Sequence, residues 1–262
     1  MPDLLLKTGL LAAQEAGELI CRNFQNLAAA DIQAKGKNDF VTRVDKEAEA
    51  IIKGAIAKKF PGHRILAEET GYSTEASEYL WVIDPLDGTT NFIQGIPHFA
   101  ISLALLRHGA VVFGLIYDPL SRECFHAFTN RGAFLNNERI AVSCTGKMSS
   151  ALGATGFPFK APQYLEKYAG IFKLMMSQCQ DLRRCGSAAL DLAYTACGRY
   201  DFFWEAHLLP WDFMAGKLLV AEAGGRTSDF SGQELAVQTS SVLAANKFLY
   251  PVLLELIGKY FK

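Results

Sequence analysis

The stretch Trp81-Val82-Ile83-Asp84-Pro85-Leu86-Asp87-Gly88-Thr89-Thr90-Asn91-Phe92 decides more about this chain than any other segment. Its first three residues are large or β-branched, which predicts a buried strand. Pro85 lacks a backbone donor and keeps the preceding residue extended, so we expect the strand to stop there. Asp84 and Asp87 then lie in a sharp turn at the carboxyl end of the strand, where open α/β folds place their ligands.

Asp84 and Asp87 predict a metal site. Two carboxylates this close repel each other unless one is protonated or a cation lies between them. A pair of oxygen donors suits a hard cation, and Mg²⁺ is the first choice. Gly88 lets the backbone approach a ligand, and residues 89–91 are expected to begin a short helix whose free N–H groups bind phosphate. The segment therefore predicts metal-assisted phosphate chemistry.

A purely structural turn is the alternative. Pro, Asp and Gly dominate tight surface turns, and an Asp can cap the helix that follows. The apolar residues 81–83 and Phe92 on either side favour a buried site, because a solvated turn seldom lies within so much aromatic surface.

A second segment supports the first. Pro210-Trp211-Asp212-Phe213 is predicted to open a helix that continues to Glu222 and stops at Gly224-Gly225. Asp212 falls in the first turn, where an isolated Asp would only offset the helix dipole, worth about 0.3–1 kcal/mol.

Together the two segments resemble a known family. The pattern Asp-Pro-x-Asp-Gly-Thr-x-Asn-Phe, followed by Trp-Asp-x-x-Ala-Gly and then Glu-Ala-Gly-Gly, resembles the inositol monophosphatase family of Mg²⁺-dependent, lithium-sensitive phosphatases. The resemblance covers nearly the whole chain. The run Arg-Arg-Cys-Gly-Ser-Ala-Ala-Leu-Asp-Leu-Ala at 183–193 is most similar to the bacterial inositol-1-monophosphatases.

The hydrophobic pattern and the resemblance together predict the fold. We expect helices over 4–20, from 42 to about 60, and over 164–176, 187–197, 213–223 and 248–260, strands over 64–67, 99–106, 110–117 and 123–128, and a polar loop at 35–39. The first half is therefore α+β and the second half α/β. The resemblance implies a layered α-β-α-β-α sandwich. We predict an N-terminal lobe of residues 1–148 with most metal ligands and a C-terminal lobe of residues 149–262 with the substrate loop and the last ligand.

The resemblance also implies the metal ligands, with two or three Mg²⁺ per active site. One ion is expected at Glu68, Asp84 and the backbone carbonyl of Leu86, and a second at Asp84, Asp87 and Asp212. Glu69 is expected to face solvent.

By the same resemblance, Glu68, Thr89 and Asp45 position and deprotonate the attacking water. The spacing of Asp45 from Thr42 also matches a helix-capping box, and Asp45 can have both roles at once.

The substrate contacts follow from the same resemblance. The phosphoryl group is expected at the backbone N–H groups of Gly88, Thr89 and Thr90, close to Asp212. The hydroxyl face is expected at Gly186, Ser187, Ala188 and Glu205. Arg183 is assigned to the substrate or to a partner subunit, with a surface salt bridge as the alternative. His207 stands where the family often has glycine, which could alter specificity.

Composition excludes several classes of protein. The 262 residues carry a net charge of −1 and are 50% hydrophobic, so nothing global indicates a nucleic-acid or membrane partner. No apolar stretch is long enough to cross a bilayer. The six cysteines form no CxxC pair, which favours free thiols in the cytoplasm, and the five histidines show no zinc-binding spacing.

The leading hypothesis is a homodimeric enzyme that hydrolyses myo-inositol 1-phosphate to inositol and phosphate with a metal-activated water. Sibling phosphatases acting on fructose 1,6-bisphosphate, histidinol phosphate or 3′-phosphoadenosine nucleotides share the metal motif and remain alternatives. A non-enzymatic alternative is a regulatory scaffold in a transcription antitermination complex, with phosphatase activity secondary, because the resemblance extends to bacterial relatives with that second role.

Overall fold

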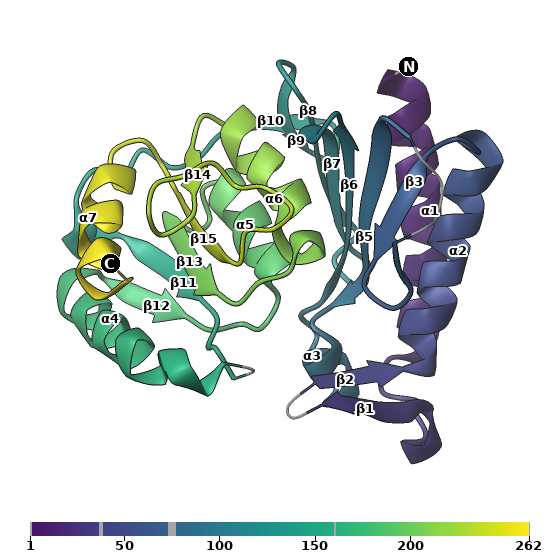
Figure 1. The fold of residues 1–262 in the computed structure, drawn as a ribbon, viewed down its shortest axis with the longest axis horizontal. Helices are drawn as coiled ribbons and strands as arrows, with labels where there is room; N and C mark the ends of the chain where they lie inside the picture. The colour runs from purple at the N-terminus through teal and green to yellow at the C-terminus, as the bar shows by residue number, and fades with distance from the viewer. Residues whose placement is uncertain (1, 37–38, 73–76, 160, 262) are drawn as a thin grey trace.

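The computed structural model describes residues 2–36, 39–72, 77–159 and 161–261. Helices and sheets alternate in five layers, which confirms the α-β-α-β-α sandwich (Figure 1). The helices are α1 (Pro2–Asn23), α2 (Arg43–Lys59), α3 (Thr89–Ile93), α4 (Leu165–Gln178), α5 (Ala188–Ala196), α6 (Pro210–Glu222) and α7 (Tyr250–Phe261). Helices α1 and α2 cover one sheet, α4 and α7 cover the other, and α5 and α6 lie between the two sheets.

The larger sheet has eight strands in the order β10-β9-β8-β7-β6-β5-β3-β4. They are β3 (Arg64–Ala67), β4 (Gly71–Tyr72), β5 (Tyr79–Asp87), β6 (Ala100–Arg107), β7 (Ala110–Asp118), β8 (Glu123–Phe128), β9 (Gly132–Leu135) and β10 (Glu138–Ile140). Neighbouring strands are antiparallel except β3 and β5, which are parallel. The parallel pair ends at one edge of the sheet, and this places Glu68 beside Asp84.

The smaller sheet has five strands in the order β12-β11-β13-β15-β14. They are β11 (Leu152–Thr155), β12 (Asp181–Arg183), β13 (Phe202–Ala206), β14 (Arg226–Ser228) and β15 (Ser241–Ala245). Strand β11 is parallel to both of its neighbours, as expected for the α/β half. A separate hairpin is formed by β1 (Ile32–Gly36) and β2 (Asp39–Thr42).

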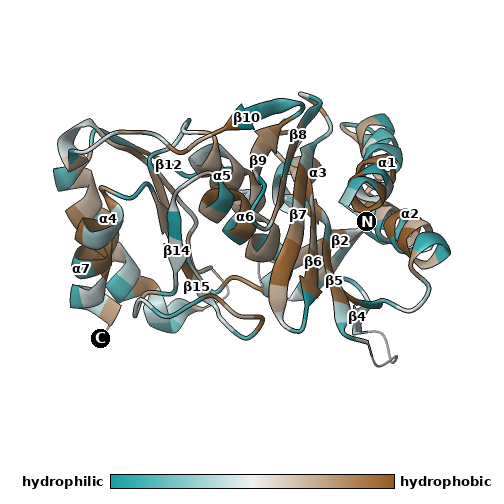
Figure 2. Cartoon of the chain, turned by 90° about the horizontal axis from the view of Figure 1, so that it is seen from above, coloured by the Kyte–Doolittle hydropathy of each residue, from teal (hydrophilic) through white to brown (hydrophobic). Residues whose placement is uncertain are grey.

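The middle helices join the two sheets in one core. Helix α6 is apolar around most of its circumference, which suits a helix packed on two sides. One buried cluster runs from Val82 and Phe125 in the larger sheet through Leu190 and Phe213 to Val242 in the smaller sheet. Figure 2 shows β5, β6 and β7 as largely apolar strands between the helix layers. This buried cluster contains residues from both sides of position 148. The division of the chain into two lobes at that position stays a prediction.

The predicted stop at Pro85 is wrong, because β5 continues to Asp87. Asp84 pairs with Ser102 and Asp87 pairs with Ala100, and the register shifts between these two pairs. Pro85 therefore lies in a β-bulge, one of the few places where a strand accepts a residue without an N–H donor. The bulge brings both carboxylates to the same end of the strand.

The polar loop predicted at 35–39 is also wrong over its described part. Lys35 and Gly36 belong to β1, and Asp39 begins β2, while residues 37–38 lie outside the described residues. Polar composition indicated a loop, but an exposed hairpin satisfies its backbone through strand pairing and needs few apolar side chains. The other predicted helices and strands are confirmed to within a few residues. Among the residues that the structure describes, no helix combines the length and apolar character that a membrane span requires.

Candidate active site

Three carboxylates converge where β5 ends and α6 begins. One oxygen each of Asp84, Asp87 and Asp212 lies within 4.8 Å of the others. Asp84 and Asp87 flank the bulge in β5, and Asp212 occupies the first turn of α6, as predicted. Glu68 joins them from the end of β3, where its backbone N–H donates to the carbonyl of Ile83 at 3.2 Å.

Hydrogen bonds hold one oxygen of each of these three aspartates. Oδ1 of Asp84 accepts from the N–H of Leu86 at 3.0 Å, and Oδ2 of Asp212 accepts from the N–H of Leu209 at 2.7 Å. Asp84 and Asp212 are thereby oriented by backbone that is close to each in sequence, and each can offer its other oxygen to a cation.

Asp87 is held from the opposite layer. Its Oδ2 accepts from Oγ of Ser187 at 2.6 Å and from the N–H of Ala189 at 2.8 Å. The first turn of α5, predicted to bind substrate hydroxyls, therefore supplies donors to a proposed metal ligand. No sequence pattern indicated this contact, because the residues are 100 and 102 positions apart.

The electrostatics of the cluster call for a cation. Burial raises the pKa of Asp84 and of Asp212 well above the usual value, and repulsion from neighbouring acids adds to both shifts. Burial also raises the pKa of Asp87 to about 6 and that of Glu68 to about 7. Four acids that resist ionisation together, and that offer only oxygen, fit a hard divalent cation such as Mg²⁺.

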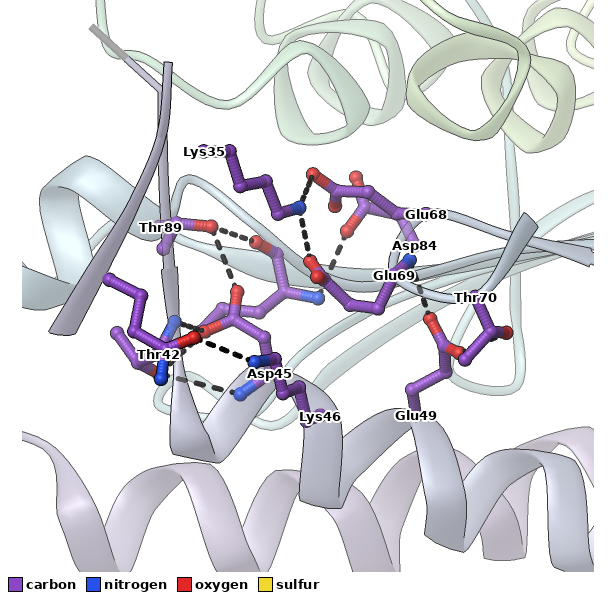
Figure 3. Close-up of polar contacts among 12 residues, drawn as sticks. Lys35, Thr42, Asp45, Lys46, Glu49, Glu68, Glu69, Thr70, Asp84 and Thr89 are labelled. Atoms are coloured by element: carbon purple, nitrogen blue, oxygen red, sulfur yellow. Dashed lines mark hydrogen bonds and ion pairs between the residues drawn. The ribbon is translucent and has the colours of Figure 1, made fainter. Parts of the chain in front are cut away.

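Lys35 reaches this cluster from the β1–β2 hairpin. Its Nζ lies 3.1 Å from Oε1 of Glu68 and 2.5 Å from Oε1 of Glu69 (Figure 3). The side chain of Glu69 is only 5% exposed, so the expectation that it faces solvent is wrong. Hairpin pairing positions Lys35, and the sequence analysis, which treated that segment as a loop, missed the contact.

Asp45 links α2 to the cluster through Thr89. The carboxylate of Asp45 is fully buried; Oδ1 accepts from Oγ1 of Thr89 at 3.0 Å, and Oδ2 accepts from the N–H of Thr42 at 2.8 Å (Figure 3). Both predicted contacts of Asp45, with the capping box and with Thr89, are therefore present. Oγ1 of Thr89 also lies 3.0 Å from the carbonyl of Leu86, and its single proton can go to only one acceptor at a time.

The cluster opens into a cavity of about 470 Å³. Gly88 forms part of its wall with φ at +97°, a conformation that favours glycine. The predicted site residues that line the cavity are Glu68, Asp84, Leu86, Asp87, Gly88, Thr89, Thr90, Gly186, Ala188, Glu205 and Asp212.

Three predicted residues lie elsewhere. Asp45 contacts Thr89 and Ser187 contacts Asp87, so both reach the cavity through another residue. Arg183 is 44% exposed and pairs with Asp181 at 2.5 Å, which is the surface salt bridge considered as its alternative.

Comparison with known proteins agrees with this geometry. The sequence model of the inositol monophosphatase family matches residues 1–262. The chain belongs to the inositol monophosphatase family. Nus factor SuhB of Escherichia coli (strain K12) is 47% identical over 243 residues, which cover 92% of this chain and 91% of the relative.

Solved structures of the inositol monophosphatase family have the same fold. The extragenic suppressor protein suhB of Bartonella henselae aligns with a TM-score of 0.93 and 37% identity, covering 98% of this chain and 99% of that one. The IMPase of Thermotoga maritima aligns with a TM-score of 0.90 and 34% identity, covering 100% and 98%. The family supports a phosphatase, and the substrate has to be argued from the cavity.

Glu205 lies in the wall of the cavity with the neighbouring Arg184. Burial raises the pKa of Glu205 to about 8, and the guanidinium of Arg184 opposes the shift. Arg184 stacks over the rings of Phe157 and Phe159, with its Cζ 5.6 Å and 5.4 Å from their centroids. We had expected Arg183 instead, because two adjacent arginines give no signal in the sequence of which one turns inward.

His207 also lines the cavity. Its φ is +70°, in the left-handed region that glycine adopts without strain. This backbone conformation gives a physical reason for the expectation of glycine at this position. The imidazole instead packs against Tyr164, with the ring centroids 5.6 Å apart.

Proposed function

We propose that this protein is a Mg²⁺-dependent phosphate monoester hydrolase that converts myo-inositol 1-phosphate to inositol and phosphate. The observation that carries the proposal is the cluster of Asp84, Asp87 and Asp212, one buried and two partly buried carboxylates whose oxygens lie within 4.8 Å of one another in a cavity of about 470 Å³. A cavity of this size accommodates a small phosphorylated ring, and the family description names the same substrate class.

The ligand sets follow from the proposed chemistry. One Mg²⁺ would be held by Glu68, Asp84 and the carbonyl of Leu86. A second would be held by Asp84, Asp87 and Asp212. A third Mg²⁺ per active site remains part of the proposal. Bound Mg²⁺ would lower the pKa of a water molecule and offset the charge that develops on the phosphate. Because Lys35 pairs with Glu68, its ammonium group has to withdraw from Oε1 before that oxygen can become a ligand.

Thr89, Asp45 and Glu68 orient and deprotonate the attacking water in this proposal. The carboxylate of Asp45 accepts the proton of the Thr89 hydroxyl, which leaves Oγ1 free to accept a hydrogen bond from water. Burial of Asp45 and its capping bonds to Thr42 fix the direction of this relay. Glu68 then takes up the proton of the water.

Phosphate and polyol are recognised on different walls. The backbone N–H groups of Gly88, Thr89 and Thr90 would bind the phosphoryl oxygens. Glu205 would accept hydrogen bonds from ring hydroxyls, with Asp212 beside the ester oxygen. The polyol is also expected to contact the cavity residues Gly186 and Ala188, while Ser187 acts through Asp87. Arg184, which lines the cavity, takes the substrate role first assigned to Arg183.

A substrate panel tests the proposal. Phosphate release with Mg²⁺ is measured on inositol 1-phosphate, fructose 1,6-bisphosphate, histidinol phosphate and 3′-phosphoadenosine 5′-phosphate. We expect the highest kcat/KM on inositol 1-phosphate. A higher kcat/KM on one of the other esters would move the assignment to that sibling activity, and no Mg²⁺-dependent release from any ester would refute the phosphatase.

A second function, binding to a transcription partner, is favoured by one observation, the 47% identity to a protein named Nus factor SuhB. We propose it as secondary, in a cytoplasmic homodimer. Of the two adjacent arginines, Arg183 is exposed and available to a partner, whereas Arg184 lines the cavity. Co-purification of transcription proteins with wild type but not with Arg183→Ala would support a partner surface there, and sedimentation velocity reports the dimer.

A further inference from the structure

A second group of metal-binding residues lies outside the phosphatase carboxylates. One ligand atom each of His98, Cys185 and Asp191 lies within 4.8 Å of the other two. His98 comes just before β6, Cys185 lies in the loop that leads into α5, and Asp191 lies on α5. The proposed phosphatase mechanism uses none of these three side chains.

Two of the three side chains carry a buried polar atom without a partner. Asp191 is 1% exposed, and its Oδ1 has no hydrogen-bond partner among the residues that the structure describes. Nε2 of His98 is likewise buried and unpartnered within that part of the chain. Buried polar atoms are normally paired, because an unpaired group costs free energy on folding. One ligand bound between Oδ1 of Asp191 and Nε2 of His98 would give both atoms a partner.

The charges around Asp191 and His98 favour a cation as this ligand. Burial raises the pKa of Asp191 well above the usual value, and repulsion from Glu205 and Asp87 adds to the shift. Burial lowers the pKa of His98, which keeps its imidazole neutral and able to donate a lone pair.

We propose that His98, Cys185 and Asp191 bind a single Zn²⁺ ion, or another divalent cation of similar softness. Thiolate, imidazole and carboxylate together are a zinc donor set, whereas Mg²⁺ takes oxygen ligands. Bonds of about 2.0–2.3 Å in a tetrahedral site place ligand atoms about 3.3–3.8 Å apart, so atoms now within 4.8 Å need to close by about 1 Å.

The hydroxyl of Tyr200 lies 3.6 Å from Sγ of Cys185. The sequence disfavoured zinc, because its cysteines and histidines show no metal-ligand spacing. His98 lies 87 residues before Cys185, and only the fold brings the two together.

The site lies directly behind the substrate loop. Nδ2 of Asn91 donates to the carbonyl of His98 at 2.7 Å and to that of Cys185 at 2.9 Å, so the side chain of Asn91 already bridges the two ligand segments. Ser187, two residues after Cys185, donates to Asp87. A cation here would tie the substrate loop to the start of β6 and leave phosphate transfer to the other carboxylates.

Cobalt spectroscopy tests the thiolate ligand directly. The full-length protein is titrated with Co²⁺ in excess Mg²⁺, which occupies the oxygen-only carboxylates. We expect one equivalent of Co²⁺ to give a thiolate-to-metal charge-transfer band in wild type and in Cys144→Ser, whose exposed thiol serves as the matched control. Cys185→Ser should lose the band, and Asp191→Asn should bind more weakly.

The Co²⁺ titration of the wild-type protein tests the site even if a variant fails to fold. No charge-transfer band in wild type, or an undiminished band in folded Cys185→Ser, would overturn the site. Thermal denaturation gives a second readout. One equivalent of Zn²⁺, added in excess Mg²⁺, should raise the Tm of wild type and leave that of Cys185→Ser unchanged. Neither result depends on phosphatase activity, so the zinc site and the proposed function can fail separately.

Discussion

Replacing Asp87 with Asn tests the metal site and the turn alternative together. Oδ2 of Asp87 accepts two bonds, from Ser187 and Ala189, and only an oxygen can accept both. In Asp87→Asn the amide oxygen takes this position, and the NH₂ group then points where a cation ligand is needed. The variant should therefore keep its fold and lose the second Mg²⁺. Removing a residue that hydrogen-bonds to a metal ligand typically lowers activity by about 10- to 100-fold. Removing the ligand itself, as in Asp87→Asn, should lower activity further.

The same substitution should stabilise the protein when no metal is present. Burial raises the pKa of Asp87 from 3.8 to about 6, so at pH 7.5 the folded protein ionises a carboxyl that resists ionisation. A shift of about two pKa units corresponds to about 3 kcal/mol, the upper limit of the gain on replacing this carboxylate with a neutral amide. In a chain of this size that gain raises the Tm by several degrees.

The assay pairs thermal denaturation in EDTA with phosphate release at saturating Mg²⁺. Asp201→Asn is the matched control, because Asp201 is also buried and accepts from Ser143 and Leu152 but does not line the cavity. The control should keep activity. If Asp87→Asn turns over normally, Asp87 is not a ligand, and if it is less stable than wild type in EDTA, the structural-turn alternative holds.

Three further predictions follow from the same site. Glu205→Gln, assayed above pH 8 where Glu205 is ionised, should lower kcat/KM on inositol 1-phosphate by about 10- to 100-fold, because a hydrogen bond to a charged acceptor is worth about 1.5–3 kcal/mol. It should change p-nitrophenyl phosphate hydrolysis far less, and equal losses would exclude hydroxyl recognition. Li⁺ should inhibit uncompetitively at millimolar concentration by occupying the Asp84, Asp87 and Asp212 position, and activity unchanged at about 0.1 M Li⁺ would contradict this. Stability in EDTA should fall as pH rises from about 4 through 7, because the folded-state pKa values of Asp87 and Glu68, about 6 and about 7, exceed the unfolded values of 3.8 and 4.5. The Tm increase on adding Mg²⁺ should therefore grow over that range, and an increase independent of pH would separate Mg²⁺ binding from these carboxyls.

The sequence predicted those parts of the site that depend on local pattern. Asp84 and Asp87 follow an apolar run, Asp212 starts a helix with clear stop signals, and Asp45 has the spacing of a capping box to Thr42. Each of these positions is fixed by neighbours within a few residues. The layered fold followed from the resemblance, and the strand and helix positions followed from hydrophobic periodicity.

What the sequence could not predict depends on contacts between distant segments. Lys35 reaches Glu68 and Glu69 across 33 and 34 residues, through a hairpin whose polar composition indicated a loop. Ser187 and Ala189 donate to Asp87 at the end of β5, and this contact depends on how segments 100 and 102 residues apart pack together. Arg183 and Arg184 are alike in sequence, and only the packing of Arg184 on Phe157 and Phe159 brings it into the cavity.

The most direct test of the central claim is the anomalous scattering of Mn²⁺ in crystals of this protein, with Mn²⁺ used in place of Mg²⁺. We expect one peak in contact with Asp84, Asp87 and Asp212, and another in contact with Glu68 and Asp84. Peaks confined to other residues, or no peak at the three aspartates in crystals that bind Mn²⁺ elsewhere, would contradict it.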